Sequence, residues 1–186
     1  MTEPAPASAR TASKPRAAYL HPAALSDESL LKQCTLEFGR TAGPGGQHRN
    51  KVETAVTITH APSGVHGSAG ERRKQYENRL MALRRLRINL ALAVRIPVHR
   101  EKHQPSELWR SRRAGEKMSV NPAHKDYPSL LAEALDVIVA RGFDVAGAAG
   151  LLGITMSQLA RLVRHEKHAF AMVNEGRTKR GLPALK

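Results

Sequence analysis

The apolar side chains of residues 54–94 change from a two-residue period to a helical period, and this change most constrains the fold. Residues 54–60 alternate, with Val56 and Ile58 on one face, which is typical of a half-buried strand. The turn residues 62–64 predict an antiparallel return strand over 65–68. From residue 71 to about 94, apolar residues form the stripe of a long helix: Leu80, Met81, Leu83, Leu86 and Leu90. These elements predict an α+β fold with a small, mostly antiparallel sheet and a long packed helix.

Shorter elements and a glycine-rich loop precede the alternating strand. Ser26, followed by two acids, is a typical helix N-cap, and we expect the first ordered element to begin there. Residues 35–38 predict a strand with Leu36 and Phe38 on one face. The loop that follows contains Gly39, Gly43, Pro44, Gly45 and Gly46. Its glycines permit backbone conformations that a Cβ would forbid, and such a loop suits the presentation of backbone N–H groups to a developing negative charge. An ordinary surface loop shows the same residues.

Composition restricts the partners and the chemistry. The chain has 30 Lys and Arg against 16 Asp and Glu, a net charge of +14, so a polyanionic partner is expected. Its longest uncharged apolar stretch, 145–154, is too short for a membrane span. Cys34 is the single cysteine and is expected to be a small buried side chain in a reducing cytosol. Histidine pairs at 99 and 103 and at 165 and 168 lack carboxylate or cysteine companions, so we expect no metal. No nucleotide-binding motif is found, and no cofactor is expected.

Composition also divides the chain into four predicted parts. Residues 1–25 are rich in Ala, Pro and Ser with scattered cations, which indicates a flexible basic arm. Residues 26–97 carry the predicted strands and long helix. Residues 98–128 mix Lys, Arg, His, Gly and Pro without a period, which indicates a basic linker. Residues 129–186 are predicted to form a small all-α domain.

The predicted all-α domain begins with a helix over 130–140, a turn at Gly142 and two more short helices to about residue 173. Residues 148–163 read Ala-Ala-x-x-Leu-Gly-Ile-Thr-x-Ser-Gln-Leu-x-x-Leu-Val, which resembles a helix-turn-helix with Gly153 at the turn. Arg161 and Arg164 then face outward from the second helix. A three-helix packing unit that reads no nucleic-acid groove is an equally good interpretation.

An ordered series of residues resembles the catalytic domain of the class I peptide-chain release factors, the GGQ domain. The series comprises Gly45-Gly46-Gln47 with His48, Asn50, Lys51, Thr54, Ala55 and Val56, then Ile58-Thr59-His60-x-Pro62-Ser63-Gly64, then Arg73-Lys74-Gln75-x-x-Asn78-Arg79-x-x-Ala82-Leu83. It spans roughly residues 36–93. Arg49 and Val52 depart from the family pattern beside the loop, which puts the loop's packing or RNA contacts in doubt more than its chemistry.

The resemblance implies hydrolysis of the peptidyl-tRNA ester in the ribosomal peptidyl-transferase centre. The backbone N–H of Gln47 would stabilise the oxyanion, and the Gln47 side chain would admit water and exclude larger nucleophiles. Gly45 and Gly46 would allow the required backbone conformation. Release factors that read stop codons carry a preceding codon-recognising domain, whereas a short tail precedes the matched residues here. The chain therefore looks like the small codon-independent members that rescue stalled ribosomes.

The basic residues near the loop and along the predicted helix are expected to contact ribosomal RNA. The candidates are His48, Arg49, Asn50, Lys51, Arg72, Arg73, Lys74, Arg79, Arg84, Arg85, Arg112 and Arg113. Residues 110–117 either sense an empty messenger-RNA channel or form a plain solubilising linker. Trp109 either stacks on a base or docks onto the protein.

Two other functions are compatible with the sequence: a catalytically idle factor that binds ribosomal RNA, and a DNA-binding regulator that uses residues 144–164. The expected partners of the hydrolase are the ribosome and peptidyl-tRNA. The linker or the C-terminal domain is a candidate to reach the messenger-RNA channel or a ribosomal protein. A cytoplasmic protein that is monomeric off the ribosome, with no membrane partner, is predicted.

Overall fold

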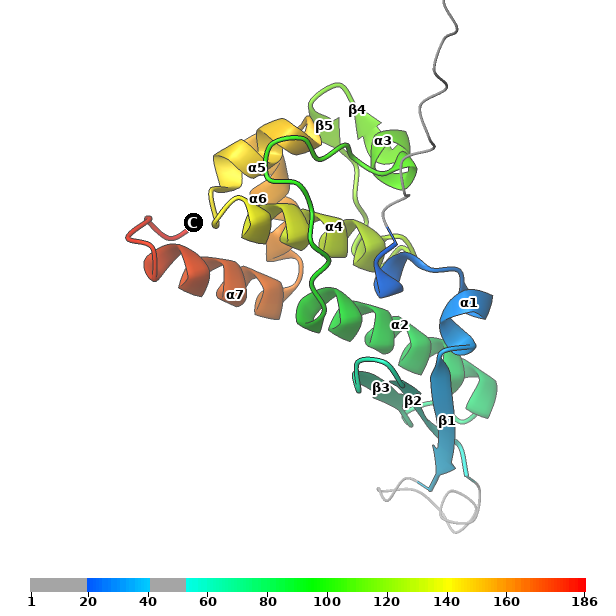
Figure 1. The fold of residues 1–186 in the computed structure, drawn as a ribbon. Coiled ribbons are helices and arrows are strands. Elements are labelled where there is room, and N and C mark those ends of the chain that lie inside the picture. Colours follow the sequence, from blue (N-terminus) through cyan, green and yellow to red (C-terminus); the bar gives the residue numbers. More distant parts are fainter. Residues whose placement is uncertain (1–19, 41–52) are drawn as a thin grey trace, which may run out of the picture.

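The computed structural model describes residues 20–40 and 53–186 and contains a three-stranded antiparallel sheet in the order β1-β2-β3 (Figure 1). Leu36 of β1 pairs with Ile58 of β2, which pairs with Gly67 of β3. The long helix α2 packs against the sheet. The α+β fold predicted from the sequence is confirmed. The bounds are β1 Cys34–Gly39, β2 Ala55–His60, β3 His66–Ala69 and α2 Gln75–Ala93.

The close packing of α2 on β3 depends on Gly67. A Cβ at this position would lie 2.3 Å from the backbone N of Leu86 and 2.4 Å from the carbonyl O of Ala82. Both atoms belong to the backbone of α2, so no side-chain rotation relieves such a contact. In β2, every second side chain is buried, and Val56 and Ile58 belong to this buried set, as the two-residue period predicts.

Helix α2 differs from the prediction at its start and on its faces. It begins at Gln75 rather than at residue 71. Leu80, assigned to the apolar stripe, is 50% exposed. Arg87 is buried despite its charge, and its guanidinium donates to the carbonyl O of Ala23 at 2.7 Å and to Asp27 at 2.6 Å. These partners come from the N-terminal segment, which covers this part of the helix.

Ordered structure begins earlier than the sequence indicates. A 3-10 turn, η1 (Pro22–Ala24), precedes α1 (Asp27–Leu31), and Ser26 caps α1 as predicted. The expectation of a flexible arm over 1–25 is wrong for its last residues, because His21 and Ala23 are fully buried. His21 holds η1 in place through hydrogen bonds with Ala23 N and with the carbonyl O of Val94 at the end of α2. The rest of the arm, 1–19, lies outside the described residues.

The segment predicted to be an aperiodic basic linker is folded. It contains α3 (Glu107–Arg112) and a hairpin of β4 (Arg113–Ala114) with β5 (Lys117–Met118). Trp109 has no exposed surface, and its indole N–H donates to the carbonyl O of Leu152 at 2.9 Å. The indole therefore docks onto the protein instead of facing a base. The expectation of an aperiodic linker is corrected, while the division into domains stays a prediction.

Four helices complete the described chain, where the sequence predicts three. They are α4 (Tyr127–Ala140), α5 (Val145–Leu152), α6 (Met156–Arg164) and α7 (Lys167–Thr178). Gly142 and Gly153, at the predicted turns, both have a positive φ that favours glycine. Among the described residues no single helix is long and apolar enough to cross a membrane; α5 and α6 pass the same length and composition test only as a pair bent by 102°.

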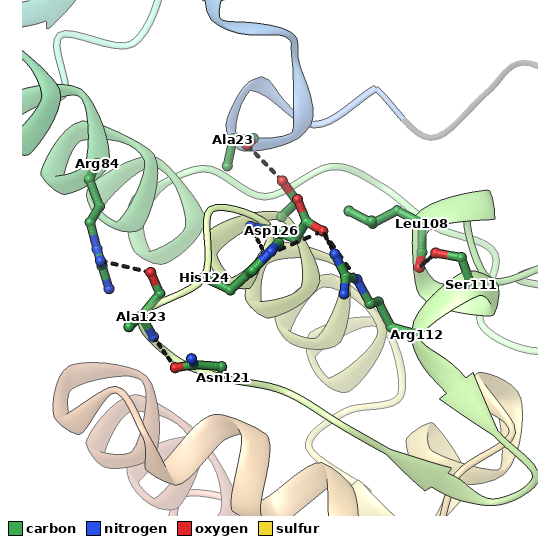
Figure 2. A network of polar contacts seen from close by, with 10 residues as sticks. Ala23, Arg84, Leu108, Ser111, Arg112, Asn121, Ala123, His124 and Asp126 are labelled. Carbon is green, nitrogen blue, oxygen red and sulfur yellow. Dashed lines mark hydrogen bonds and ion pairs between the residues drawn. The ribbon is translucent and has the colours of Figure 1, made fainter.

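The sheet-and-α2 unit and the helical region meet at a polar joint, shown in part in Figure 2. Arg84 of α2 donates to the carbonyl oxygens of Pro122 (2.7 Å) and Ala123 (2.9 Å), immediately before α4. The hydroxyl of Ser129 in α4 donates to Ala23 O, which also accepts from Arg87. The helical region is therefore docked onto α2 through hydrogen bonds to backbone oxygens as well as through apolar contacts.

Candidate functional site: the base of the 41–52 segment

The predicted catalytic residues Gly45, Gly46 and Gln47, and the predicted RNA contacts at 48–51, lie outside the described residues. The segment that carries them connects β1 to β2, and both of its ends are described. Gly39 pairs with Ala55 at the last rung of the β1–β2 ladder. Just beyond this rung, Arg40 and Glu53 form an exposed ion pair, with Nε and Oε1 3.7 Å apart. The two ends of the 41–52 segment are thus held side by side.

Asn78 fixes the end of the segment that enters β2. Its side chain is fully buried, and its amide nitrogen donates to the carbonyl oxygens of Thr54 at 2.7 Å and Arg72 at 2.9 Å. Its side-chain oxygen accepts from the backbone N–H of Arg72 at 2.9 Å. One buried amide therefore ties the start of β2 to the turn that leads into α2, and the apolar surroundings strengthen each bond.

Gln75, one turn before Asn78, adds a second attachment. Its side-chain amide donates to the carbonyl O of Glu53 at 2.9 Å. Consecutive backbone carbonyls, those of Glu53 and Thr54, are therefore both bound by the first turn of α2. This end of the sheet points away from α4–α7 (Figure 1). The described geometry is that of a base, formed by the ends of β1 and β2 and the first turn of α2, that lies at the end of the sheet remote from the helical region.

Four cations surround the base and are exposed: Arg72, Arg73, Lys74 and Arg79. Within residues 20–40 and 53–186, none of their side chains forms an ion pair. Their charges are therefore available to a polyanion that approaches the 41–52 segment.

The other four described candidates for RNA contact already have intramolecular partners. Arg84 is part of the joint, and Arg85 forms an ion pair with Glu71 at 2.6 Å. Hydrogen bonds from backbone N–H groups hold the pKa of the Glu71 carboxyl below its usual range, and Arg85 lowers this pKa to a smaller extent. Arg112 pairs with Asp126, and Arg113 donates to the carbonyl O of Gly153. RNA contact by any of these residues stays a prediction.

The remaining candidate side chains have structural settings. Cys34 is half-buried, its thiol donates to the carbonyl O of Leu30, and burial raises its pKa. A cavity of about 790 Å³ beside α3 and α4 is lined by His99, His103 and Glu133, among others. There the buried carboxylate of Glu133 accepts hydrogen bonds from Ser106 and has His103 Nε2 3.0 Å away, which fixes the start of α3. No group of three or more His, Cys, Asp or Glu suited to a metal is found in the described part of the chain.

The chain matches a known protein family over the residues that form the base. Residues 30–126, more than half of the chain, match the RF-1 domain, so the chain belongs to the RF-1 domain family. The match includes the sheet, α2, α3 and the β4–β5 hairpin, and it ends at Asp126, where α4 begins.

Individual relatives match over a shorter stretch. The chain is 53% identical to peptide chain release factor 1 of Chlorobaculum tepidum over 51 residues, which are 27% of this chain and 14% of that protein. It is 41% identical to peptide chain release factor 1 of Granulibacter bethesdensis over 73 residues, 39% of this chain and 20% of that protein. It is 51% identical to the chloroplastic release factor PrfB1 of Arabidopsis thaliana over 55 residues, 30% of this chain and 12% of that protein. The chain thus spans a fifth or less of the length of these relatives.

Two residues of the site have roles that the sequence did not reveal. Asn78 and Gln75 are present in the family resemblance, but nothing in their spacing indicates that both bind the backbone before β2. A signal for Asn78 does exist: it precedes Ala82 and Leu86 by four and eight residues, so the helical period places this amide on the apolar side of the helix.

Proposed function

We propose that this protein hydrolyses the ester that links a nascent peptide to tRNA on the ribosome. The observation that carries the proposal is the Gly45-Gly46-Gln47 sequence within a segment whose two ends are fixed by β1, β2 and α2, in a member of the RF-1 domain family. The three relatives described above are named as peptide chain release factors, which supports the same reaction.

The proposed chemistry needs little from the protein beyond one positioned amide. An activated ester is attacked by water, and the oxyanion that forms is stabilised by the backbone N–H of Gln47. Gly45 and Gly46 give the backbone the freedom to present that N–H group. The role of Asn78 and Gln75 is to hold the base, so that the segment is delivered in a constant orientation.

The exposed cations are proposed to hold the base against ribosomal RNA. Arg72, Arg73, Lys74 and Arg79 lie at the end of α2 that binds the carbonyls of Glu53 and Thr54, so phosphate contacts there would fix the base of the segment relative to the RNA. The residues at 48–51 are proposed to add contacts from within the segment.

The finer proposal is that release does not require a stop codon and that the protein rescues stalled ribosomes in the cytoplasm. It is supported by the helices that follow the RF-1 domain match, α4 to α7, of which α4 is docked onto α2. We propose that this region takes the place of codon recognition in fixing the protein on the ribosome.

The test is release of a labelled peptide from ribosome-bound peptidyl-tRNA by the wild-type protein and by Gly46→Ala. Wild-type release that falls by at least about a hundredfold in Gly46→Ala, with ribosome binding retained, is the expected result. Equal release by both proteins contradicts catalysis by this segment. Ribosome binding without release by either protein identifies an idle RNA-binding factor.

The same assay with truncated, sense-codon and stop-codon messages tests the finer proposal. Release on the truncated or sense-codon message is expected, and a strict requirement for a stop codon contradicts rescue. Tight, sequence-selective binding to duplex DNA, with no association with ribosomes, would favour the regulator.

A further inference from the structure

Helices α5 and α6 form a helix-turn-helix whose second helix is exposed along one side. The two helices are bent by 102° at Gly153, within the range of helix-turn-helix units. The inner sides of both helices are buried through Ala148, Ala149, Leu152, Leu159, Leu162 and Val163. The opposite side of α6 is exposed at Ser157, Arg161 and Arg164. Packing therefore fixes α6 with its polar side outward.

Helix α6 stands between two hollows. A cavity of about 300 Å³ lies on the side of residues 118–120, and one of about 460 Å³ lies on the side of the C-terminal residues Leu185 and Lys186. Gln158 and Arg161 line both cavities. A convex helix with a hollow on either side is compatible with the wide, shallow minor groove of an A-form RNA helix, whose bordering strands could lie over the hollows.

The β4–β5 hairpin is attached to the beginning of α6. The backbone N–H of Thr155, the N-cap of α6, donates to the carbonyl O of Glu116 at 3.2 Å, and Arg113 donates to the carbonyl O of Gly153 at 3.2 Å. Lys117 is exposed on the same hairpin. We call the outward-facing residues of these two elements the α6–hairpin surface; they are the exposed residues Arg113, Lys117, Ser157, Arg161 and Arg164 and the half-buried Gln158.

The α6–hairpin surface is cationic. It has four positive side chains, and the nearby exposed carboxylate is Glu116 of the hairpin turn. Glu166, just after α6, instead has His168 Nδ1 2.9 Å away. The guanidinium of Arg164 lies over the ring of Phe170, 5.3 Å from its centroid, which orients it while its N–H groups remain able to donate. Phosphate groups on both sides of the α6 ridge would match this charge.

We propose that the α6–hairpin surface binds a helical segment of ribosomal RNA, with α6 lying across the wide, shallow minor groove and Arg113, Lys117, Arg161 and Arg164 on the phosphates that border it. The choice of RNA rests on the proposed function. A single helix-turn-helix unit with few cations binds weakly alone, but delivery by the docked RF-1 domain raises its effective concentration at one place on the ribosome. The joint then holds this contact in a fixed position relative to the sheet and α2.

The test compares two double variants that lose the same charge. Arg161→Gln/Arg164→Gln alters the α6–hairpin surface, while Lys32→Gln/Lys179→Gln removes two exposed lysines from α1's end and α7's end. Both full-length variants, after circular dichroism has shown that they fold, are titrated with transcribed large-subunit ribosomal RNA and with a 30-base-pair DNA duplex over a range of salt. Because each lost phosphate contact lowers the slope of log K against log salt by roughly 0.9, the first variant should lose about 2 in slope and about tenfold or more in affinity.

Each outcome decides the proposal. Loss of RNA affinity and slope by the α6 variant alone supports it. Equal behaviour of the two double variants overturns it, and so does wild-type binding to the DNA duplex that is tighter than binding to RNA and depends on Arg161 and Arg164. If the wild-type protein releases no peptide but the α6 variant still loses RNA binding, the proposed hydrolysis fails and this RNA contact stands.

Discussion

The base of the 41–52 segment and the helical region bury different kinds of group. At the base, the buried side chain of Asn78 binds three backbone atoms, and Gln75 binds a fourth. In the helical region, α4 has eleven buried residues, nearly all apolar, and packs against α2, α5 and α6. Apolar packing is not directional, whereas hydrogen bonds fix individual atoms. The contrast indicates that the base fixes the backbone at the start of β2, while the apolar packing of the helical region stabilises the fold.

The boundary between these regions is not the boundary of the family match. The RF-1 domain match runs to residue 126 and includes α3 and the hairpin, yet Trp109 of α3 is buried against the helical region. The end of the family match therefore lies inside one continuous core. It follows that mutations within the matched part should separate into those that disturb the base and those that disturb the shared core.

The largest expected effect is on the shared core. Trp109→Ala removes a fully buried indole and its hydrogen bond to Leu152 O, so it should lower the free energy of unfolding by about 3–5 kcal/mol. Trp109→Phe keeps most of the volume and should cost about 1–3 kcal/mol, because it leaves the Leu152 carbonyl without this donor. Denaturant unfolding measures both. A change within experimental error for Trp109→Ala would mean that α3 is not part of the core.

The base should respond differently, in activity as well as in stability. Asn78→Ala leaves the buried carbonyls of Thr54 and Arg72 and the N–H of Arg72 without their partner, which should cost about 2–3 kcal/mol. Peptide release per folded molecule should also fall, because the segment loses its fixed orientation. Release is measured at a temperature where unfolding curves show the variant to be folded.

Asn89→Ala is the matched control for Asn78→Ala. It is the same substitution on the same helix, but Asn89 is exposed and donates to His66 O on β3, away from the base. It should cost about 1 kcal/mol or less and leave release per folded molecule unchanged. An equal loss of release in both variants would remove the distinction between the base and the rest of α2.

The parts that the sequence predicts are those whose cause is local. The alternation of 54–60, the turn at 62–64, the cap at Ser26 and the turn at Gly153 each depend on residues a few positions apart, and each is found as predicted. The apolar stripe of residues 71–94 also predicted the long helix correctly, although the predicted first residue and the predicted burial of Leu80 were wrong.

The parts that were missed depend on distant partners. The burial of Arg87 depends on Ala23 O, which lies 64 residues away, and the order of residues 20–25 depends on His21 and Val94, which are 73 residues apart. Residues 98–128 show no local period, and their fold depends instead on distant contacts such as the hydrogen bond from Trp109 to Leu152 O, 43 residues later. For the candidate site the sequence supplies the motif, but not the buried amide that holds its base.

His21 should make the joint sensitive to acid. Its Nδ1 accepts from Ala23 N and its Nε2 lies 3.1 Å from Val94 O, and burial, with Arg95 adding repulsion, lowers its pKa from 6.5 to about 4. The unfolded state therefore binds more protons below 6.5, so stability falls as the pH drops from 6.5 toward 4, by about 2 kcal/mol between pH 7 and pH 5.

Burial lowers the pKa of His60 as well, so the His21 contribution is measured as a difference. Unfolding of the wild-type protein and of His21→Gln is followed at several pH values. His21→Gln should be less stable at pH 7 and should lose less stability on acidification. Parallel pH profiles would show that His21 is not neutral within the fold.

The smallest expected effect tests whether the two regions are coupled by hydrogen bonds at all. Arg84→Gln removes the donors to Pro122 O and Ala123 O and should cost about 1 kcal/mol, with faster amide hydrogen exchange in residues 119–130 than in the sheet. Arg85→Gln, one position along the same helix, loses an exposed pair with Glu71 and should leave exchange at 119–130 unchanged. If the two variants exchange alike, the hydrogen bonds of Arg84 do not contribute to holding the regions together, and Arg84 is then free to serve RNA as the sequence predicts.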